Sequence, residues 1–106
     1  MSKVLWLVSM NFNQPEKEAE FNHWYNNIHL PEVLTSPGIV GATRYRATRE
    51  VAGQRRYLSV YEFPNQEVLE AFNASPSMAS ARKDFQTNWR HYTSDFLSWW
   101  FEVIEP

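Results

Sequence analysis

The chain has 106 residues, a formal net charge of −2 and no cysteine. This length predicts one domain over residues 1–106, the near-neutral charge argues against the basic stripe that nucleic-acid binding requires, and the missing cysteines exclude disulfide scaffolds and thiolate catalysis. The first apolar run, residues 4–10, is too short to span a membrane, so we expect a cytoplasmic protein without nucleic-acid or membrane partners.

The first third of the chain predicts a strand followed by a helix. Residues 3–12 are mostly apolar and β-prone, which indicates a strand buried on at least one face. Residues 13–34 predict a helix, because Pro15 suits a first helical turn and the glutamates after it suit a helix N-terminus. Pro37 and Gly38 stop this helix. Its predicted buried stripe consists of Phe21, Trp24, Tyr25 and Ile28.

The rest of the chain adds a hairpin, two helical stretches and a last strand. We expect residues 39–50 and 55–63 to pair as antiparallel strands around a turn at residues 51–54. Asn65 is placed to cap a helix over residues 66–74. The remaining predicted elements are a helix over residues 77–89 and a strand over residues 93–104.

This order, β-α-β-β-α-β, is typical of the ferredoxin-like fold, an α+β architecture with helices on one face of an antiparallel sheet. The first and last strands, however, carry apolar residues on both faces. Leu5 and Leu7 alternate with Trp6, and Trp99 is followed by Trp100. Helices cover one face only, so the other face needs a second cover. A second copy that packs sheet on sheet is the simplest one, and we predict a homodimer.

The predicted first helix carries many aromatic and hydrogen-bonding side chains around Pro31. Proline has no amide hydrogen, so the helix must kink or restart there and free a backbone carbonyl beside His29. Tyr25 and Asn26 precede His29 by four and three residues, which predicts one shared patch. Histidine suits acid–base catalysis because its unperturbed pKa lies near neutrality. Two roles stay open: His29 stabilises the bend, or it is catalytic with Tyr25 and Asn26 as hydrogen-bonding partners.

Neither a metal nor a cofactor is expected. His23 and His29 are six residues apart and so lie on different helix faces, unlike the i, i+4 pair of zinc-binding helices. Acidic residues with ligand spacing do not accompany them. The chain has three glycines and no glycine-rich phosphate loop, which argues against a nucleotide cofactor.

Further side chains are candidates for binding a substrate. Aromatic residues make up 16% of the chain, which predicts either a dense core with an oligomer interface or a pocket for a flat apolar ligand. Trp6 and Trp24 are candidate pocket walls. Tyr61 is a candidate wall and donor to a substrate oxygen, although packing is the commoner role of a strand tyrosine. Arg44 either binds an anionic substrate group or pairs at the surface with Glu62 or Glu50.

A set of aromatic, proline, glycine and charged residues recurs along the helix, its stop and the next two strands: Phe21, Trp24, Tyr25, His29, Pro31, Glu32, Pro37, Gly38, Arg44, Tyr45, Tyr57, Leu58, Tyr61 and Glu62. This set resembles the EthD-like group of the dimeric α+β barrel superfamily. The resemblance covers nearly the whole chain and keeps the element order. It implies a domain that dimerises into an α+β barrel, with His29 lining a functional pocket. The superfamily includes cyclases, decarboxylases, dehydratases, isomerases, cofactor-free monooxygenases and haem-degrading enzymes, so the resemblance does not fix an activity.

These features favour a small cofactor-independent enzyme of lyase or isomerase type. It would carry out a cyclisation, isomerisation, dehydration or decarboxylation on an apolar, aromatic or polyketide-like carbonyl compound. Two other classes stay open. One is a haem-degrading enzyme or cofactor-free monooxygenase, and the other is a non-catalytic accessory protein that binds a small molecule.

Overall fold

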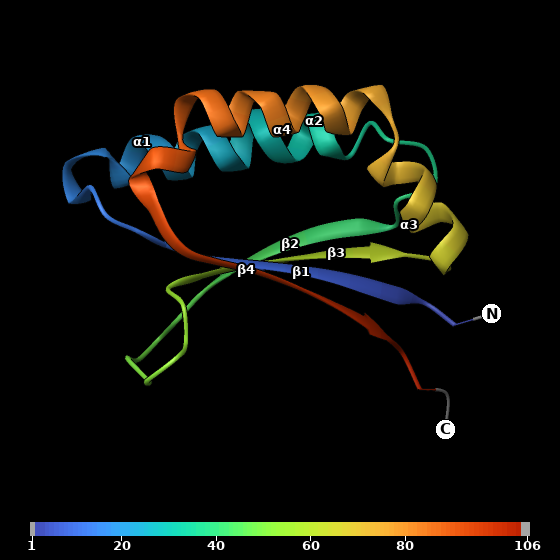
Figure 1. The fold of residues 1–106 in the computed structure, drawn as a ribbon, viewed down its shortest axis with the longest axis horizontal. Coiled ribbons are helices and arrows are strands. Elements are labelled where there is room, and N and C mark those ends of the chain that lie inside the picture. The colour runs from blue at the N-terminus through green and yellow to red at the C-terminus, as the bar shows by residue number, and fades with distance from the viewer. Residues whose placement is uncertain (1, 105–106) are drawn as a thin grey trace.

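The computed structural model describes residues 2–104, and its helices lie on one side of a four-stranded sheet (Figure 1). The strands are β1 (Val4–Phe12), β2 (Gly41–Arg46), β3 (Tyr57–Phe63) and β4 (Thr93–Glu102). The helices are α1 (Glu18–Trp24), α2 (Leu30–Val33), α3 (Gln66–Asn73) and α4 (Pro76–Asn88), with short helical turns η1 (Pro15–Lys17), η2 (Tyr25–His29) and η3 (Arg90–Tyr92). This order confirms the predicted ferredoxin-like α+β fold.

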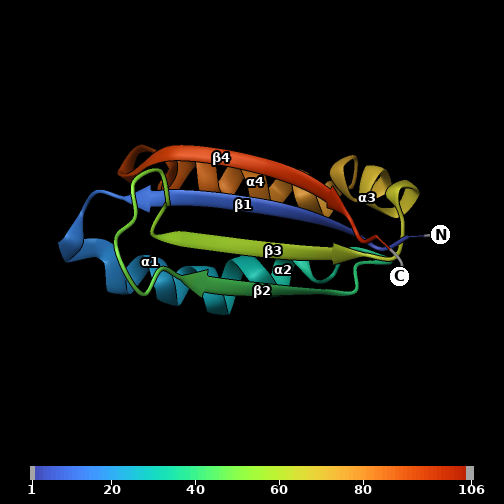
Figure 2. The same ribbon diagram turned by 90° about the horizontal axis from the view of Figure 1, so that it is seen from below.

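The sheet has the strand order β2-β3-β1-β4, and all neighbouring strands are antiparallel. Trp6 of β1 lies opposite Tyr61 of β3 and Trp100 of β4. Opposite residues in an antiparallel pair point to the same face, so Trp6 and Tyr61 share one side of the sheet. Figure 2 shows α4 behind β1 and β4, with α1 and α2 behind β3 and β2.

The helical segment around Pro31 contains a wide turn. The amide of Leu30 donates to the carbonyl of Tyr25, five residues earlier, so η2 is a π-turn between α1 and α2. Pro31 cannot continue the α-helical hydrogen-bond ladder, and it sits instead in the first turn of α2. The wider turn shifts the buried stripe by one residue: His29 is buried, whereas Ile28 is 50% exposed. The prediction that Ile28 belongs to the buried stripe was wrong for this reason.

The β2–β3 hairpin is less regular than predicted. The two strands span residues 41–46 and 57–63 rather than 39–50 and 55–63. The turn at residues 51–54 is present, because the amide of Gln54 donates to the carbonyl of Val51 at 2.9 Å. The arms beside this turn carry charged, mostly exposed residues with no apolar side to bury, so regular pairing ends early. In Figure 1 this loop extends away from the helices.

The core lies between the helices and the sheet, and the other sheet face is uncovered. Phe21, Phe63 and Phe72 are fully buried between the two layers. On the far side, Tyr45 and Phe101 keep 54% and 53% of their surface exposed. We call this far side the open sheet face; its apolar members are Leu5, Leu7, Tyr45, Leu58, Val60, Leu97, Trp99 and Phe101. The prediction that helices cover only one apolar face is confirmed.

Gly38→Ala is expected to destabilise the fold more than Gly53→Ala. Both glycines have a left-handed backbone, with φ values of +85° and +83°, which costs an alanine about 1–2 kcal/mol. A Cβ on Gly38 would also lie 2.7 Å from Cγ1 of Val68, a side chain that cannot rotate freely, whereas Gly53 has open space. Urea unfolding of both variants tests this, and equal losses of unfolding free energy would contradict the close approach of Gly38 to α3.

Candidate functional site

An apolar cavity of about 290 Å³ lies between the two layers. The sheet contributes its floor through β1, β3 and β4, and η2, α4 and η3 contribute the rest. Its lining residues are Trp6, Val8, Met10, Tyr25, His29, Tyr61, Met78, Arg82, Phe85, Gln86, Arg90 and Phe96. Small-molecule sites are concave, mostly apolar and equipped with a few polar groups, and this cavity has that composition.

His29 is a buried, neutral imidazole in the wall of this cavity. Its ring stacks on Trp24 at 4.8 Å between centroids and meets the edge of Tyr25 at 4.7 Å. Burial lowers the pKa of His29 from 6.5 to about 4; the nearby Arg44 guanidinium lowers the pKa further, and the carboxylate of Asp84 opposes the shift. Within residues 2–104 Nδ1 is buried without a hydrogen-bond partner. A role in stabilising the bend would require His29 to bond a backbone carbonyl freed by Pro31. Nδ1 of His29 forms no such bond within these residues.

Three hydroxyl groups form a chain at the cavity floor. Ser59 Oγ donates to Tyr25 Oη at 2.9 Å, and Tyr25 Oη lies 2.9 Å from Tyr61 Oη. The chain has three hydroxyl hydrogens and two internal bonds, so one tyrosine hydrogen remains for another acceptor. Burial raises the pKa of Tyr61 well above its ordinary 10, which keeps its proton in place. Both tyrosines line the cavity, so a ligand oxygen can accept this hydrogen.

The two tryptophans predicted as walls occupy different positions. Trp6 lines the cavity and stacks on Tyr61, with 5.0 Å between ring centroids. Trp24 is not a lining residue; it lies behind His29, and its Nε1 donates to Oδ2 of Asp84 at 3.1 Å. Asn88 donates to the other carboxylate oxygen of Asp84 at 2.5 Å. Trp24 is therefore a support that holds the His29 ring in place, and its predicted role as a wall is corrected.

Asn26 and Arg44 lie outside the cavity. Arg44 Nη1 donates to Asn26 Oδ1 at 3.0 Å, and the guanidinium carbon lies 4.1 Å from the Tyr25 ring centroid. The predicted convergence of Asn26 with His29 was wrong, because the π-turn directs Asn26 toward the β2 side. The alternative surface pair of Arg44 with Glu62 was also wrong, since Glu62 points to the open sheet face and pairs with Lys3 at 3.5 Å. Arg44 backs the Tyr25 ring instead.

Three polar lining residues were not foreseen from the sequence: Arg82, Gln86 and Arg90. Ser59, which bonds to Tyr25 beside the cavity, was not foreseen either. A signal for Arg82 and Gln86 was present. Met78, Arg82 and Gln86 follow one another at intervals of four residues, the spacing that places side chains on one face of a helix. Ser59 carried no such signal, because its bond to Tyr25 spans 34 residues of sequence.

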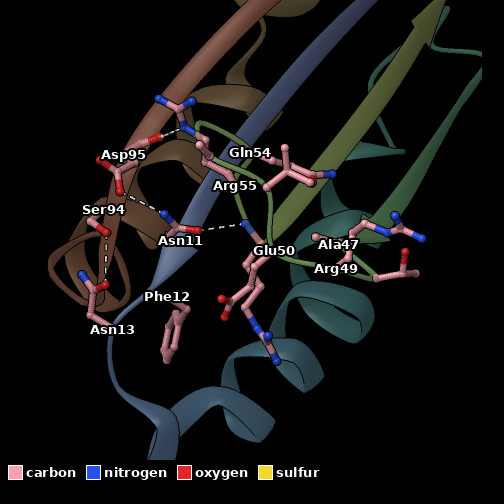
Figure 3. Close-up of a pocket in the computed structure, with 14 residues that line it drawn as sticks. Asn11, Phe12, Asn13, Ala47, Arg49, Glu50, Gln54, Arg55, Ser94 and Asp95 are labelled. Atoms are coloured by element: carbon pink, nitrogen blue, oxygen red, sulfur yellow. Dashed lines mark hydrogen bonds between the residues drawn. The ribbon is translucent and has the colours of Figure 1, made fainter.

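A larger hollow of about 760 Å³ lies under the β2–β3 loop, and Figure 3 shows its polar lining. Several of its polar groups are hydrogen-bonded to one another. Asn11 Nδ2 donates to Asp95 Oδ2 and Arg55 Nε to the Asp95 carbonyl, both at 2.9 Å, and Ser94 Oγ donates to Asn13 at 3.0 Å (Figure 3). The Arg55 bond attaches the loop to β4, and the other two bonds join β4 to the end of β1. The smaller interlayer cavity, with its unused donor and buried imidazole, is the better candidate site.

Two further observations concern the described part of the chain. None of its helices has the length and hydrophobicity needed to cross a lipid bilayer. Residues 2–104 also contain no group of three or more histidine, cysteine or acidic side chains arranged to hold a metal ion.

The fold and the cavity define the class: a two-layer, ferredoxin-like α+β protein with an apolar cavity between helices and sheet. Residues 3–99 match the family model described as "Domain of unknown function (DUF4286)", and the chain belongs to this family. No curated protein matches the sequence.

Solved structures of similar fold come from several bacteria. An ethyl tert-butyl ether D (EthD) family protein from Bacillus halodurans C-125 is 18% identical, with 93% of this chain and 97% of that chain covered and a TM-score of 0.69. A DABB family protein with a ferredoxin-like fold from Mesorhizobium loti is 11% identical (99% and 100% covered, TM-score 0.77). SnoaB, a cofactor-independent oxygenase from Streptomyces nogalater, is 13% identical (100% and 97% covered, TM-score 0.71). The predicted resemblance to the EthD-like group is confirmed for the fold.

Proposed function

We propose that the cavity binds a small, flat, apolar carbonyl compound and that His29 exchanges a proton with the carbon next to the carbonyl. One observation carries the proposal: a buried neutral imidazole and an unused tyrosine hydroxyl hydrogen line the same apolar cavity. General acid–base catalysis needs a base in reach of the substrate, and enolate formation needs a donor for the developing oxyanion. His29 supplies the base, and the Tyr25–Tyr61 pair supplies the donor.

The proton transfers follow from these positions. His29 is unprotonated at neutral pH because the pKa is about 4, so the basic form is always available. It accepts a proton from the substrate carbon, and the electron pair moves onto the carbonyl oxygen, which accepts the tyrosine hydrogen bond. The low pKa makes the imidazolium a strong acid, which returns the proton at the same or another atom. Cyclisation, isomerisation and dehydration begin with such a proton removal, and decarboxylation uses the second half, the protonation of the enolate that remains after carbon dioxide leaves.

Hydrogen–deuterium exchange into 2-tetralone tests the proposal without knowledge of the natural substrate. This compound is a flat aromatic ketone with acidic protons beside its carbonyl. Proton NMR in D₂O at neutral pD should show loss of these signals faster with protein than with buffer alone. Binding of the ketone, detected by tryptophan fluorescence, without accelerated exchange would instead support the non-catalytic accessory protein.

A cofactor-independent oxygenase is the second candidate. The likeness of fold to SnoaB supports it, and the unprotonated His29 in the cavity wall would be the acceptor for a phenol proton, which leaves a phenolate ring for oxygen to attack. An oxygen electrode distinguishes the two candidate functions. An oxygenase consumes oxygen when it acts on a phenolic substrate such as anthralin, whereas an enzyme that only exchanges protons does not. A Soret band on titration with haemin would favour the haem-degrading alternative.

We further propose that the chain forms a homodimer through the open sheet face. Exposed apolar patches of this kind are uncommon on monomers, and here the strands β1 and β4 bear large side chains on that side. Light scattering at micromolar concentration should give twice the chain mass of 12.6 kDa. Phe101→Lys should shift the mass toward the monomer, while Ile28→Lys, on the helical side, should not. A wild-type monomer would contradict this interface.

A further inference from the structure

We propose that the natural ligand is a carboxylate: an apolar body in the interlayer cavity with an acid group bound at its mouth by Arg82 and Arg90. This inference rests on the proposed function, since it names the ligand class of the same cavity. The cavity lining contains two arginines and no acidic residue. The chain as a whole has 12 acidic and 10 basic residues, so a purely cationic lining is not a consequence of composition.

Both arginines have charge available for a ligand. Each is exposed, and neither forms an ion pair within residues 2–104. Arg56, by comparison, is engaged by Glu18 at 2.7 Å. Guanidinium groups bind carboxylates with charge-assisted hydrogen bonds, often two at once, which makes arginine the common choice for this task. An anion at the cavity mouth would find two such groups.

The positions of these side chains suit a ligand that is apolar on one side and acidic on the other. Arg82 and Gln86 lie one turn apart on α4, and Arg90 follows in η3. The Arg90 guanidinium lies over the ring of Phe96, 4.6 Å from its centroid, and Phe96 itself lines the cavity. The apolar floor therefore continues directly to the charged group, as an aromatic carboxylate requires.

Arg44 adds positive charge outside the cavity, behind the wall that Tyr25 forms opposite α4. Its guanidinium lies 4.1 Å from the Tyr25 ring centroid, and its Nε and Nη2 are buried without partners among the described residues. No acidic side chain of this region neutralises it, because its single bonded partner there is the neutral Asn26. An anionic ligand would be favoured by this field as well as by the arginines at the mouth.

Matched ligands test the inference: 2-naphthoate and its neutral isostere 2-naphthamide, titrated by calorimetry. The wild type should bind the naphthoate about tenfold or more tightly, the usual worth of one charge-assisted hydrogen bond. The Arg82→Gln/Arg90→Gln double variant should lose most of this preference and keep only the part that Arg44 contributes. Arg49→Gln, which removes one exposed arginine from the β2–β3 loop, controls for the loss of a positive charge elsewhere and should keep the preference.

The outcomes separate this inference from the proposed function. Equal binding of both ligands by the wild type overturns the carboxylate assignment but leaves the cavity as a ligand site. A preference that survives undiminished in the double variant, or that Arg49→Gln lowers equally, overturns the role of Arg82 and Arg90. Binding of neither ligand, together with no binding of 2-tetralone, overturns the proposed function itself.

Discussion

His29→Gln should lower the rate of α-proton exchange into 2-tetralone by roughly 10²–10⁴-fold, the usual contribution of one general acid–base group. Glutamine is close in size to histidine and retains a hydrogen-bonding group, but it cannot accept a proton at neutral pH. The wild-type rate should stay level through neutral pH and fall only in acid, because burial holds the pKa of His29 at about 4. NMR exchange rates between pH 3.5 and 8 measure both effects.

His91→Gln is the matched control. It makes the same substitution at an exposed histidine that does not line the cavity. It should leave both the exchange rate and the ligand affinity unchanged. If His29→Gln remains folded by circular dichroism and keeps the wild-type exchange rate, His29 is not the base and the acid–base proposal is wrong.

The second large effect is on stability in acid. Unfolding frees His29 to its ordinary pKa of 6.5, whereas burial holds the folded pKa at about 4. The unfolded chain therefore binds a proton more tightly than the folded one. Neutral His29 contributes about 3 kcal/mol to the free energy of unfolding. This contribution is complete above pH 6.5 and is lost as the pH falls to about 4.

Urea unfolding of the wild type and of His29→Gln at pH 7 and pH 4 isolates this contribution. Other acid-sensitive groups, such as Glu18 with its lowered pKa, act equally in both proteins and cancel in the difference. The wild type should lose more unfolding free energy than the variant over this range. Parallel losses in the two proteins would mean that His29 titrates with an ordinary pKa and is not buried as described.

Much of the fold could be predicted because its signals are local. Asn65 accepts a hydrogen bond from the Val68 amide as a helix cap, at 2.9 Å, and Pro76 begins α4. The apolar residues on both faces of β1 predicted the open sheet face. Caps, prolines and alternation each act within a few residues, so one sequence is enough to locate them.

The site could be predicted only in part. Tyr25, His29, Trp6 and Tyr61 were identified as candidates, and all four line one cavity. Asn26 was misplaced because the prediction assumed α-helical spacing, and the π-turn changes which residues share a face.

The partners of Arg44 depend on packing between distant segments. Strand alternation separates the face of Arg44 from that of Tyr45, but it gives no information on which helix residue meets Arg44. Asn26 does so across 18 residues of sequence. The cavity lining also combines the arginines of α4 and η3 with apolar residues of three strands. Only the folded chain brings these residues together.

A crystal structure of the protein with bound 2-naphthoate tests the central claim most directly. The account predicts the rings between Trp6 and Phe96, the carboxylate within hydrogen-bond distance of Arg82 or Arg90, and the far edge of the rings facing His29 and Tyr61. A ligand found only under the β2–β3 loop or on the open sheet face, with the interlayer cavity closed by side chains, would contradict it.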